Sequence, residues 1–234
     1  MKFIIADEVL EKYPEYVCGI VVARNIDNRG LSGEILQMIK NEEARIKLDF
    51  NLETLAQHPF VQNWRKVYSS FGSRPAEFRA SSEALIRRTL KGNSVSHISR
   101  LVDIYNFISL KYRTPVGGED LEKISGNLRL RFADGSEKFI PLGSEKNENP
   151  DAGEVVYVDD EKNVLCRRWN WRESEITKLT ENTKSAIIVI EALPPLAEND
   201  VMRALGDAAG LVKKFCGAET KIFVLSSKNM EIEI

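Results

Sequence analysis

The chain has 234 residues, 43% of them hydrophobic, and a formal net charge of −2. That length can bury a substantial core and suits one large domain or two small ones. No apolar run approaches the roughly 18 residues that span a bilayer, and the N-terminus lacks a signal-peptide core, so we expect a cytoplasmic protein without membrane contact. Three widely spaced cysteines and only two histidines argue against a disulfide framework and a metal site.

The first half of the chain predicts helices. Residues 31–48 have apolar side chains at helical spacing, with Ser32 as N-cap and a break expected near Asn41. Further helices are expected on either side of Pro59, from Ser81 to Gly92 and over residues 96–112. We interpret residues 1–60 as an N-terminal helical extension and residues 61–234 as the main domain, packed together as one unit.

Beyond residue 126 the apolar spacing becomes that of strands. "NLRLRF" and "EKFIPLG" flank Asp134-Gly135 and predict one hairpin, and "EVVYVDDEKNVLCRRWNW" predicts a second. Residues 185–193 predict a central strand, followed by a helix that ends at Gly217 and by a last strand. The expected fold class is α+β, in which an N-terminal helical part packs on a largely antiparallel or mixed sheet, with a closing C-terminal helix and strand.

Positive charge is concentrated in one part of the chain. Residues 64–113 carry ten Lys and Arg against three Asp and Glu, whereas the chain as a whole is slightly acidic. Such a block is what a polyanionic partner requires, although helix faces are often charged only for solubility. The charge pattern alone leaves both interpretations open.

A second cluster of positive charge, with two tryptophans, is "RRWNWR", from Arg167 to Arg172. Strand alternation predicts Arg168, Asn170 and Arg172 on one face, and Arg167 with both tryptophans on the other. Cations beside aromatic rings are typical of single-stranded nucleic-acid binding. The alternative, that the tryptophans fill the core and the arginines pair with carboxylates, is favoured for this motif alone. Cys166, just before it, is more readily a buried structural cysteine than a nucleophile.

The common catalytic motifs are absent. The chain has no G-x-G-x-x-G, G-x-x-x-x-G-K-[ST], H-E-x-x-H or G-x-S-x-G pattern. We therefore expect neither a nucleotide cofactor nor a catalytic metal.

Several segments, in order, resemble a known family. "RPAEFRASSEALIRR", "LVDIYNFISLKYRTPVGGEDLEKI", "DGSEKFIPLG", "GEVVYVDD", "CRRWNWRES" and "IVIEAL" are similar to the B3/B4 domain of the phenylalanyl-tRNA synthetase β subunit, from about Tyr68 to Lys221. The resemblance implies an editing domain that binds the acceptor end of tRNA and hydrolyses the ester of a wrongly attached amino acid. Gly117 stands where that domain commonly has a histidine, so the identity of the amino acid is not inherited.

The resemblance and the chemistry of an activated ester imply roles for named residues. Asn106 matches the asparagine that the family presents to its editing pocket, and the backbone of Gly117 and Gly118 offers N–H groups to a developing oxyanion. Substrate contacts are expected from Ser109 and from Glu173, which falls near the family's acidic selection loop. The candidate RNA contacts are Arg79, Arg87, Arg88, Arg167, Arg168, Trp169 and Arg172.

Two other functions are compatible with these residues. The scaffold could bind tRNA without catalysis, for which the glycine at position 117 is the argument. It could also serve a small-molecule hydrolase or an amino-acid-binding protein that never contacts RNA. Salt-dependent tRNA binding separates the first alternative from the second.

Overall fold

The computed structural model describes residues 1–234. Its elements are β1 (Lys2–Ile5), α1 (Asp7–Lys12), β2 (Val17–Arg24), α2 (Gly33–Asp49), η1 (Leu55–Gln57), α3 (Pro59–Ser70), α4 (Ser81–Leu90), α5 (Arg100–Tyr112), β3 (Val116–Asp120), η2 (Leu121–Lys123), β4 (Leu128–Phe132), β5 (Val155–Val158), β6 (Val164–Arg167), β7 (Arg172–Glu173), β8 (Ser185–Ala192), α6 (Glu198–Cys216), β9 (Glu219–Leu225) and β10 (Glu231–Glu233). The fold is α+β, as the sequence predicts.

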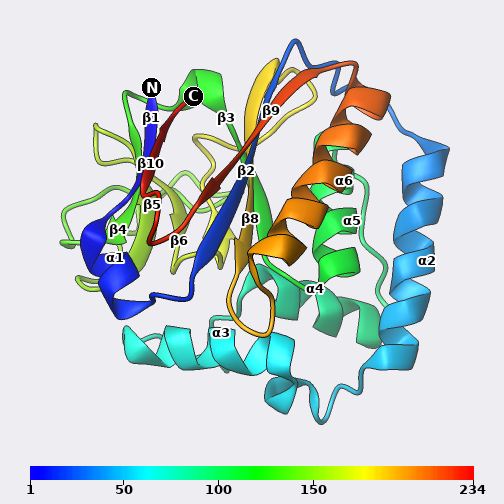
Figure 1. Cartoon of the computed structure of the whole chain (residues 1–234), viewed down its shortest axis with the longest axis horizontal. Coiled ribbons are helices and arrows are strands. Elements are labelled where there is room, and N and C mark those ends of the chain that lie inside the picture. Colours follow the sequence, from blue (N-terminus) through cyan, green and yellow to red (C-terminus); the bar gives the residue numbers. More distant parts are fainter.

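The strands form two sheets. One has the order β10-β1-β4-β5-β6-β7 and is antiparallel except for the β1–β4 pair, and the other has the antiparallel order β3-β8-β2-β9. Helices α2, α5 and α6 stand on the outer side of the second sheet, and α3 runs beneath both (Figure 1). The molecule therefore has three layers, with the β3-β8-β2-β9 sheet in the middle.

Side-chain alternation along β2 and β8 explains this position. In β2, Cys18, Ile20 and Val22 join the core shared with the first sheet, whereas Val21 and Ala23 join the core beneath the helices. β8 is buried on both faces in the same way, which suits its continuous apolar sequence. Any side chain at Gly19 would meet α6, because a Cβ there would lie 2.5 Å from Val201 Cγ1.

The structure confirms several predicted elements. Ser32 caps α2 by accepting from the Ile35 N–H, and α6 ends at Gly217, whose φ of +62° is left-handed. The second hairpin forms between β5 and β6. No helix is both long and apolar enough to cross a membrane.

Three predictions are corrected. Helix α2 continues through Asn41 without a break, because Ile39, Ile46 and the residues around them keep one continuous buried face. Residues 1–60 are not a purely helical extension, since they supply β1 and also β2, which lies between β8 and β9. No hairpin forms at Asp134-Gly135: Glu137 accepts from both of their N–H groups, which holds a loop instead.

Candidate functional site

A polar cleft opens between two helices and the end of the first sheet. Its volume is about 370 Å³. Helix α4 contributes Ser81 and Arg88, α5 contributes Asn106 and Ser109, and the turn and strand after β6 contribute residues 170–173. The cleft thus joins segments that are about 90 residues apart in the chain.

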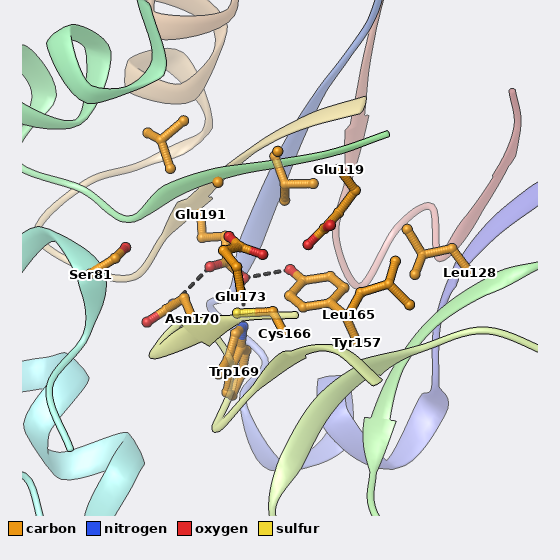
Figure 2. A pocket seen from close by; sticks show the side chains of 14 residues that line it. Ser81, Glu119, Leu128, Tyr157, Leu165, Cys166, Trp169, Asn170, Glu173 and Glu191 are labelled. Carbon is orange, nitrogen blue, oxygen red and sulfur yellow. Dashed lines mark hydrogen bonds between the residues drawn. The ribbon is translucent and has the colours of Figure 1, made fainter. Parts of the chain in front are cut away.

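An acidic cavity lies at the inner end of this cleft. It has a volume of about 30 Å³, between the two sheets, and Ser81, Val116, Asn170 and Glu173 line both hollows. Three glutamates line the cavity, Glu119 from β3, Glu173 from β7 and Glu191 from β8 (Figure 2). No lysine, arginine or histidine lines it.

Glu191 is held at the base of the cavity by neutral donors. Its carboxylate accepts from the Tyr16 hydroxyl at 2.7 Å, from Trp169 Nε1 at 2.7 Å and from Asn170 Nδ2 at 2.7 Å, and also from the Tyr157 hydroxyl. Burial raises the pKa of Glu191, and the hydrogen bonds from Tyr157 and the other donors oppose that rise. These donors are uncharged, so they hold the carboxyl group in place but supply no positive charge to pair with it.

Glu119 and Glu173 form a closely coupled pair of carboxyl groups. Burial raises the pKa of Glu119 well above its usual value, and the nearby charge of Glu173 raises it further. Burial also raises the pKa of Glu173, while a hydrogen bond from Glu119 lowers it. Of the two carboxyl groups, Glu119 therefore has the more strongly raised pKa.

Comparison with known proteins identifies the family. The model of the B3/4 domain matches residues 63–217, more than half of the chain. The chain belongs to the B3/4 domain family. The matched range includes the helices, strands and turn that line the cleft and the cavity.

Relatives of this B3/4 protein include much longer chains. The phenylalanine–tRNA ligase β subunit of Fusobacterium nucleatum is 26% identical over 121 residues, which are 52% of this chain and 15% of that subunit. The same subunit of Chromobacterium violaceum is 35% identical over 83 residues, 36% of this chain and 10% of the subunit. An N-terminal fragment of the phenylalanyl-tRNA synthetase β subunit from Pyrococcus horikoshii has a TM-score of 0.47 at 17% identity, covering 96% of this chain and 53% of the fragment.

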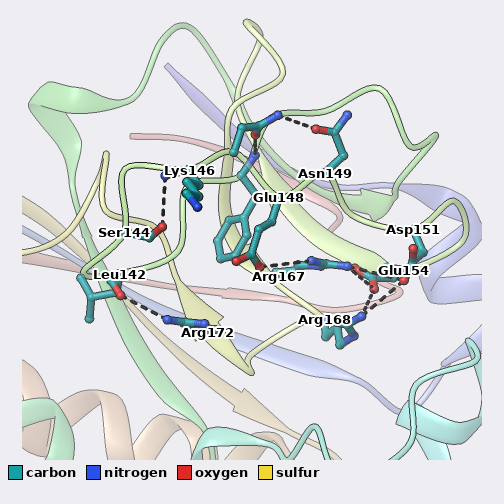
Figure 3. A network of polar contacts seen from close by, with 12 residues as sticks. Leu142, Ser144, Lys146, Glu148, Asn149, Asp151, Glu154, Arg167, Arg168 and Arg172 are labelled. Atoms are coloured by element: carbon teal, nitrogen blue, oxygen red, sulfur yellow. Dashed lines mark hydrogen bonds and ion pairs between the residues drawn. The ribbon is translucent and has the colours of Figure 1, made fainter.

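The structure corrects the expected exposure of two arginines in this B3/4 domain. Arg167 and Arg168 are each only 7% exposed. Both bind Glu154, with Arg167 Nε 2.7 Å from Oε2 and Arg168 Nη2 2.7 Å from Oε1, and both also pair with Asp151 (Figure 3). Their positive charges are therefore already paired within the protein, with the buried carboxylate of Glu154 and the exposed carboxylate of Asp151.

The two tryptophans of the motif have different positions. β6 ends at Arg167, so residues 168–171 form a turn and not the expected alternating strand. Trp169 is fully buried against Tyr13, Tyr16 and Trp64, which corrects its assignment as an RNA contact. Trp171 is instead the partly exposed ring, and it lines the polar cleft.

The remaining arginines border the cleft. Arg88 and Arg172 line it, and neither pairs with a carboxylate: Arg88 donates to the Ser94 carbonyl and Arg172 to the Leu142 carbonyl. Arg79 and Arg87 both approach the buried Glu83 and border an outer cleft of about 400 Å³ that shares Arg88 with the polar cleft. Arg88 and Arg172 are thus the freest of the expected cations.

The expected polar contacts are divided between the polar cleft and the acidic cavity. Asn106 and Ser109 line the cleft, but the Ser109 hydroxyl donates to the Thr114 carbonyl, so it can only accept from a ligand. In the edge strand β3, the Asp120 N–H turns away from β8 to Thr177, so strand alternation turns the Gly118 N–H the same way. The Gly118 N–H thus points away from β8 and the Gly117 N–H toward it, and both glycines line the acidic cavity, not the polar cleft.

Sequence reasoning missed part of the site. Glu119, Glu191 and Asn170 line the cavity but were not candidates. Glu191 had a usable signal, because it is the one acidic residue in the apolar run "SAIIVIEAL" and falls on the face of Ile187 and Val189. Cys166 also lines the cavity, and burial followed by the charge of Glu173 raises its pKa well above the usual value, which disfavours a nucleophilic thiolate.

Proposed function

We propose that this protein binds the 3′ acceptor end of tRNA in the polar cleft and hydrolyses the ester of mischarged aminoacyl-tRNA. One observation carries the proposal: two arginines that pair with no carboxylate and an aromatic ring line the cleft, which leads into a small cavity lined by three glutamates. Arginines and an aromatic ring bind phosphates and unstacked bases, and a small inner cavity can hold a small reacting group. The names of the relatives, which are tRNA ligases, support the same polyanionic partner.

The rim supplies binding. Arg88 reaches the cleft from α4 and Arg172 from β7. Trp171, the residue before Arg172, lines the same cleft. Guanidinium groups bind phosphate oxygens in a fork, and an indole ring stacks on any base. A terminal nucleotide would therefore be held with its ribose toward Asn106.

The interior supplies orientation. An aminoacyl ester is already activated, so a water placed by Asn106 and an oxyanion held by the Gly118 N–H are sufficient chemistry without a metal or nucleotide. The attacking water adds its oxygen to the ester carbonyl, the bond to the ribose oxygen breaks, and the free amino acid and tRNA leave. Glu173 borders the cleft, the acidic cavity and an apolar pocket beside Leu179, and is therefore placed to contact the amino acid.

The test is a panel of correctly and incorrectly charged tRNAs, with hydrolysis followed at several salt concentrations. We expect deacylation of at least one mischarged species, and binding that weakens as salt rises. Arg88→Ala and Arg172→Ala should each weaken binding and reduce the slope of log affinity against log salt by about 0.7. Arg203→Ala is the matched control, because Arg203 is on α6 and pairs only with Asp200.

The outcomes separate the alternatives. Salt-dependent binding without hydrolysis of any species supports a tRNA-binding module that lacks catalysis. Binding that is insensitive to salt, or equal losses in Arg203→Ala, would refute RNA binding at this cleft.

A further inference from the structure

The acidic cavity is small, and its carboxyl groups have no basic side chain beside them. Three glutamates line it without any basic side chain, and its 30 Å³ has room for about two water-sized groups. Buried carboxylates are normally paired with cations, since an isolated charge away from water is costly. The cavity therefore has the composition of a site whose cation is part of the ligand.

Two carboxyl oxygens in the cavity have no partner outside their own pair. Apart from the contact between Glu119 and Glu173, neither Glu119 Oε2 nor Glu173 Oε2 has a hydrogen-bond partner, and Glu119 is only 6% exposed. In Figure 2 both carboxyl groups point into the centre of the cavity, above Tyr157. Buried polar atoms without such partners are rare in folded proteins, and here they face a cavity that a small ligand could occupy.

Gly117 makes room for this arrangement. A Cβ at position 117 would lie 2.5 Å from Glu173 Oε1, so any larger residue would force the carboxylate to move. A larger residue at position 117 and the observed position of the Glu173 carboxylate therefore exclude each other.

The other charged and titratable groups nearby leave the pair uncompensated. They are Tyr105 from α5, Asp120 from β3, Tyr157 from β5, Cys166 from β6, Arg172 from β7, Lys178 from the following loop and Glu191 from β8. Neither of the two cations among them binds the pair: Lys178 pairs with Glu175, and Arg172, which binds no carboxylate, donates to the Leu142 carbonyl. The remaining groups are neutral or acidic.

We propose that the acidic cavity binds a primary ammonium group, with Glu119 and Glu173 as its direct partners and Glu191 as the charge behind them. A primary ammonium has three N–H donors, which are enough for the Oε2 atoms of Glu119 and Glu173, and the group fits a volume of this size. A metal ion fits less well, because no group of three or more His, Cys, Asp or Glu is arranged to hold one. Where the ammonium belongs to an aminoacyl ester, this inference rests on the proposed function and makes the free amine a condition of substrate binding.

Ammonium binding should release a proton. The raised pKa of Glu119 favours a proton on that carboxyl group in the empty cavity. An entering –NH₃⁺ is best held by two carboxylates, so this proton leaves to solvent as the ammonium enters. Affinity should therefore rise with pH, until the amine itself loses its proton.

The experiment uses the full chain and uncleavable probes in which a 3′-amide replaces the ester of aminoacyl-adenosine. The phenylalanyl probe has an α-amine, α-N-acetyl-lysyl has only a side-chain amine, lysyl has both and N-acetyl-phenylalanyl has neither. Titration calorimetry in phosphate and in Tris counts the protons released. We expect at least tenfold tighter binding of an amine-bearing probe than of N-acetyl-phenylalanyl, with about one proton released. The two singly aminated probes show which amine is bound.

Variants assign the effect to the cavity. Glu119→Gln should abolish both the preference for the amine and the proton release, whereas Glu122→Gln, an exposed residue of η2, should change neither. Equal or tighter binding of the N-acetyl probe, or a preference that persists in Glu119→Gln, overturns the proposal.

A second measurement separates this inference from the proposed function. Methylammonium chloride, titrated against potassium chloride, should shift the carboxyl ¹³C resonances of Glu119 and Glu173 in the labelled protein. A shift without any tRNA binding or hydrolysis leaves the ammonium site and refutes the proposed function. Equal shifts with potassium would refute the ammonium site, whatever the protein does with tRNA.

Discussion

Substitution of Gly117 by alanine tests the geometry on which the site depends. The new Cβ would lie 2.5 Å from Glu173 Oε1, about 0.9 Å short of the 3.4 Å at which ordinary contact begins. The backbone of β3 is fixed by its pairing with β8, so the Glu173 side chain must make this movement. A displacement of about 1 Å at a reacting centre lowers rates by about 100-fold, or about 2.7 kcal/mol.

The assay is single-turnover deacylation of whichever mischarged tRNA is the best substrate, with unfolding by urea measured in parallel. We expect stability to change by less than about 1 kcal/mol, because alanine is also the better strand residue by about 0.5–1 kcal/mol. Gly210→Ala is the control: no atom lies within 4 Å of its Cβ position on α6, so full activity is expected.

A double-mutant cycle shows whether Glu173 transmits the effect. Once Glu173→Ala has removed the carboxylate, Gly117→Ala has nothing left to displace and should cause no further loss. If the two rate losses multiply instead, the alanine acts through another group. That result would refute the reasoning.

Three further predictions concern stability. Trp169→Phe removes the Nε1–H that donates to Glu191 and should lower the free energy of urea unfolding by about 1.5–3 kcal/mol. Unchanged stability together with weakened tRNA binding would instead show that the Trp169 ring contacts RNA. Arg167→Met leaves the buried Glu154 paired with Arg168 alone and should cost about 1.5–3 kcal/mol, whereas Arg172→Met should stay within about 0.5 kcal/mol; equal costs would contradict the different burial of the two arginines. Because the folded pKa of Glu119 is raised, wild-type stability should fall as pH rises above 4.5, and Glu119→Gln should reduce that fall; parallel unfolding curves of the two proteins against pH would contradict the raised pKa.

Elements set by local patterns could be predicted from the sequence. Ser32, Gly217 and the apolar run of β8 are local signals, and each has the predicted role. The Asp134-Gly135 hairpin failed because Glu137, three residues from Asp134, offers its carboxylate to the turn N–H groups. Propensity predicts a turn there, but the segment after it pairs with distant residues, because Lys138 bridges to Asn163 and Pro141 to Ser174.

Residue type alone supplies candidates for the site, and burial decides which of them a ligand can reach. Asn106 and Ser109 line the polar cleft, Gly118 lines the acidic cavity, and Glu173 lines both. The sequence cannot show that a guanidinium is already neutralised, because Glu154 lies 13 residues from Arg167 across a hairpin. Salt-bridge partners are a property of the folded chain, so charge counts overestimate the cations that remain for a ligand.

The residues of the motif "RRWNWR" have different structural roles. Arg167 and Arg168 bind Glu154 and so fix where the strand ends and the turn begins. The turn then directs Trp169 inward, where its indole N–H holds Glu191. Since a buried ion pair has a defined geometry, displacing it would displace the turn and with it the residues at its end. The first two arginines therefore act on a ligand only through Trp171 and the two residues that follow it, which line the cleft.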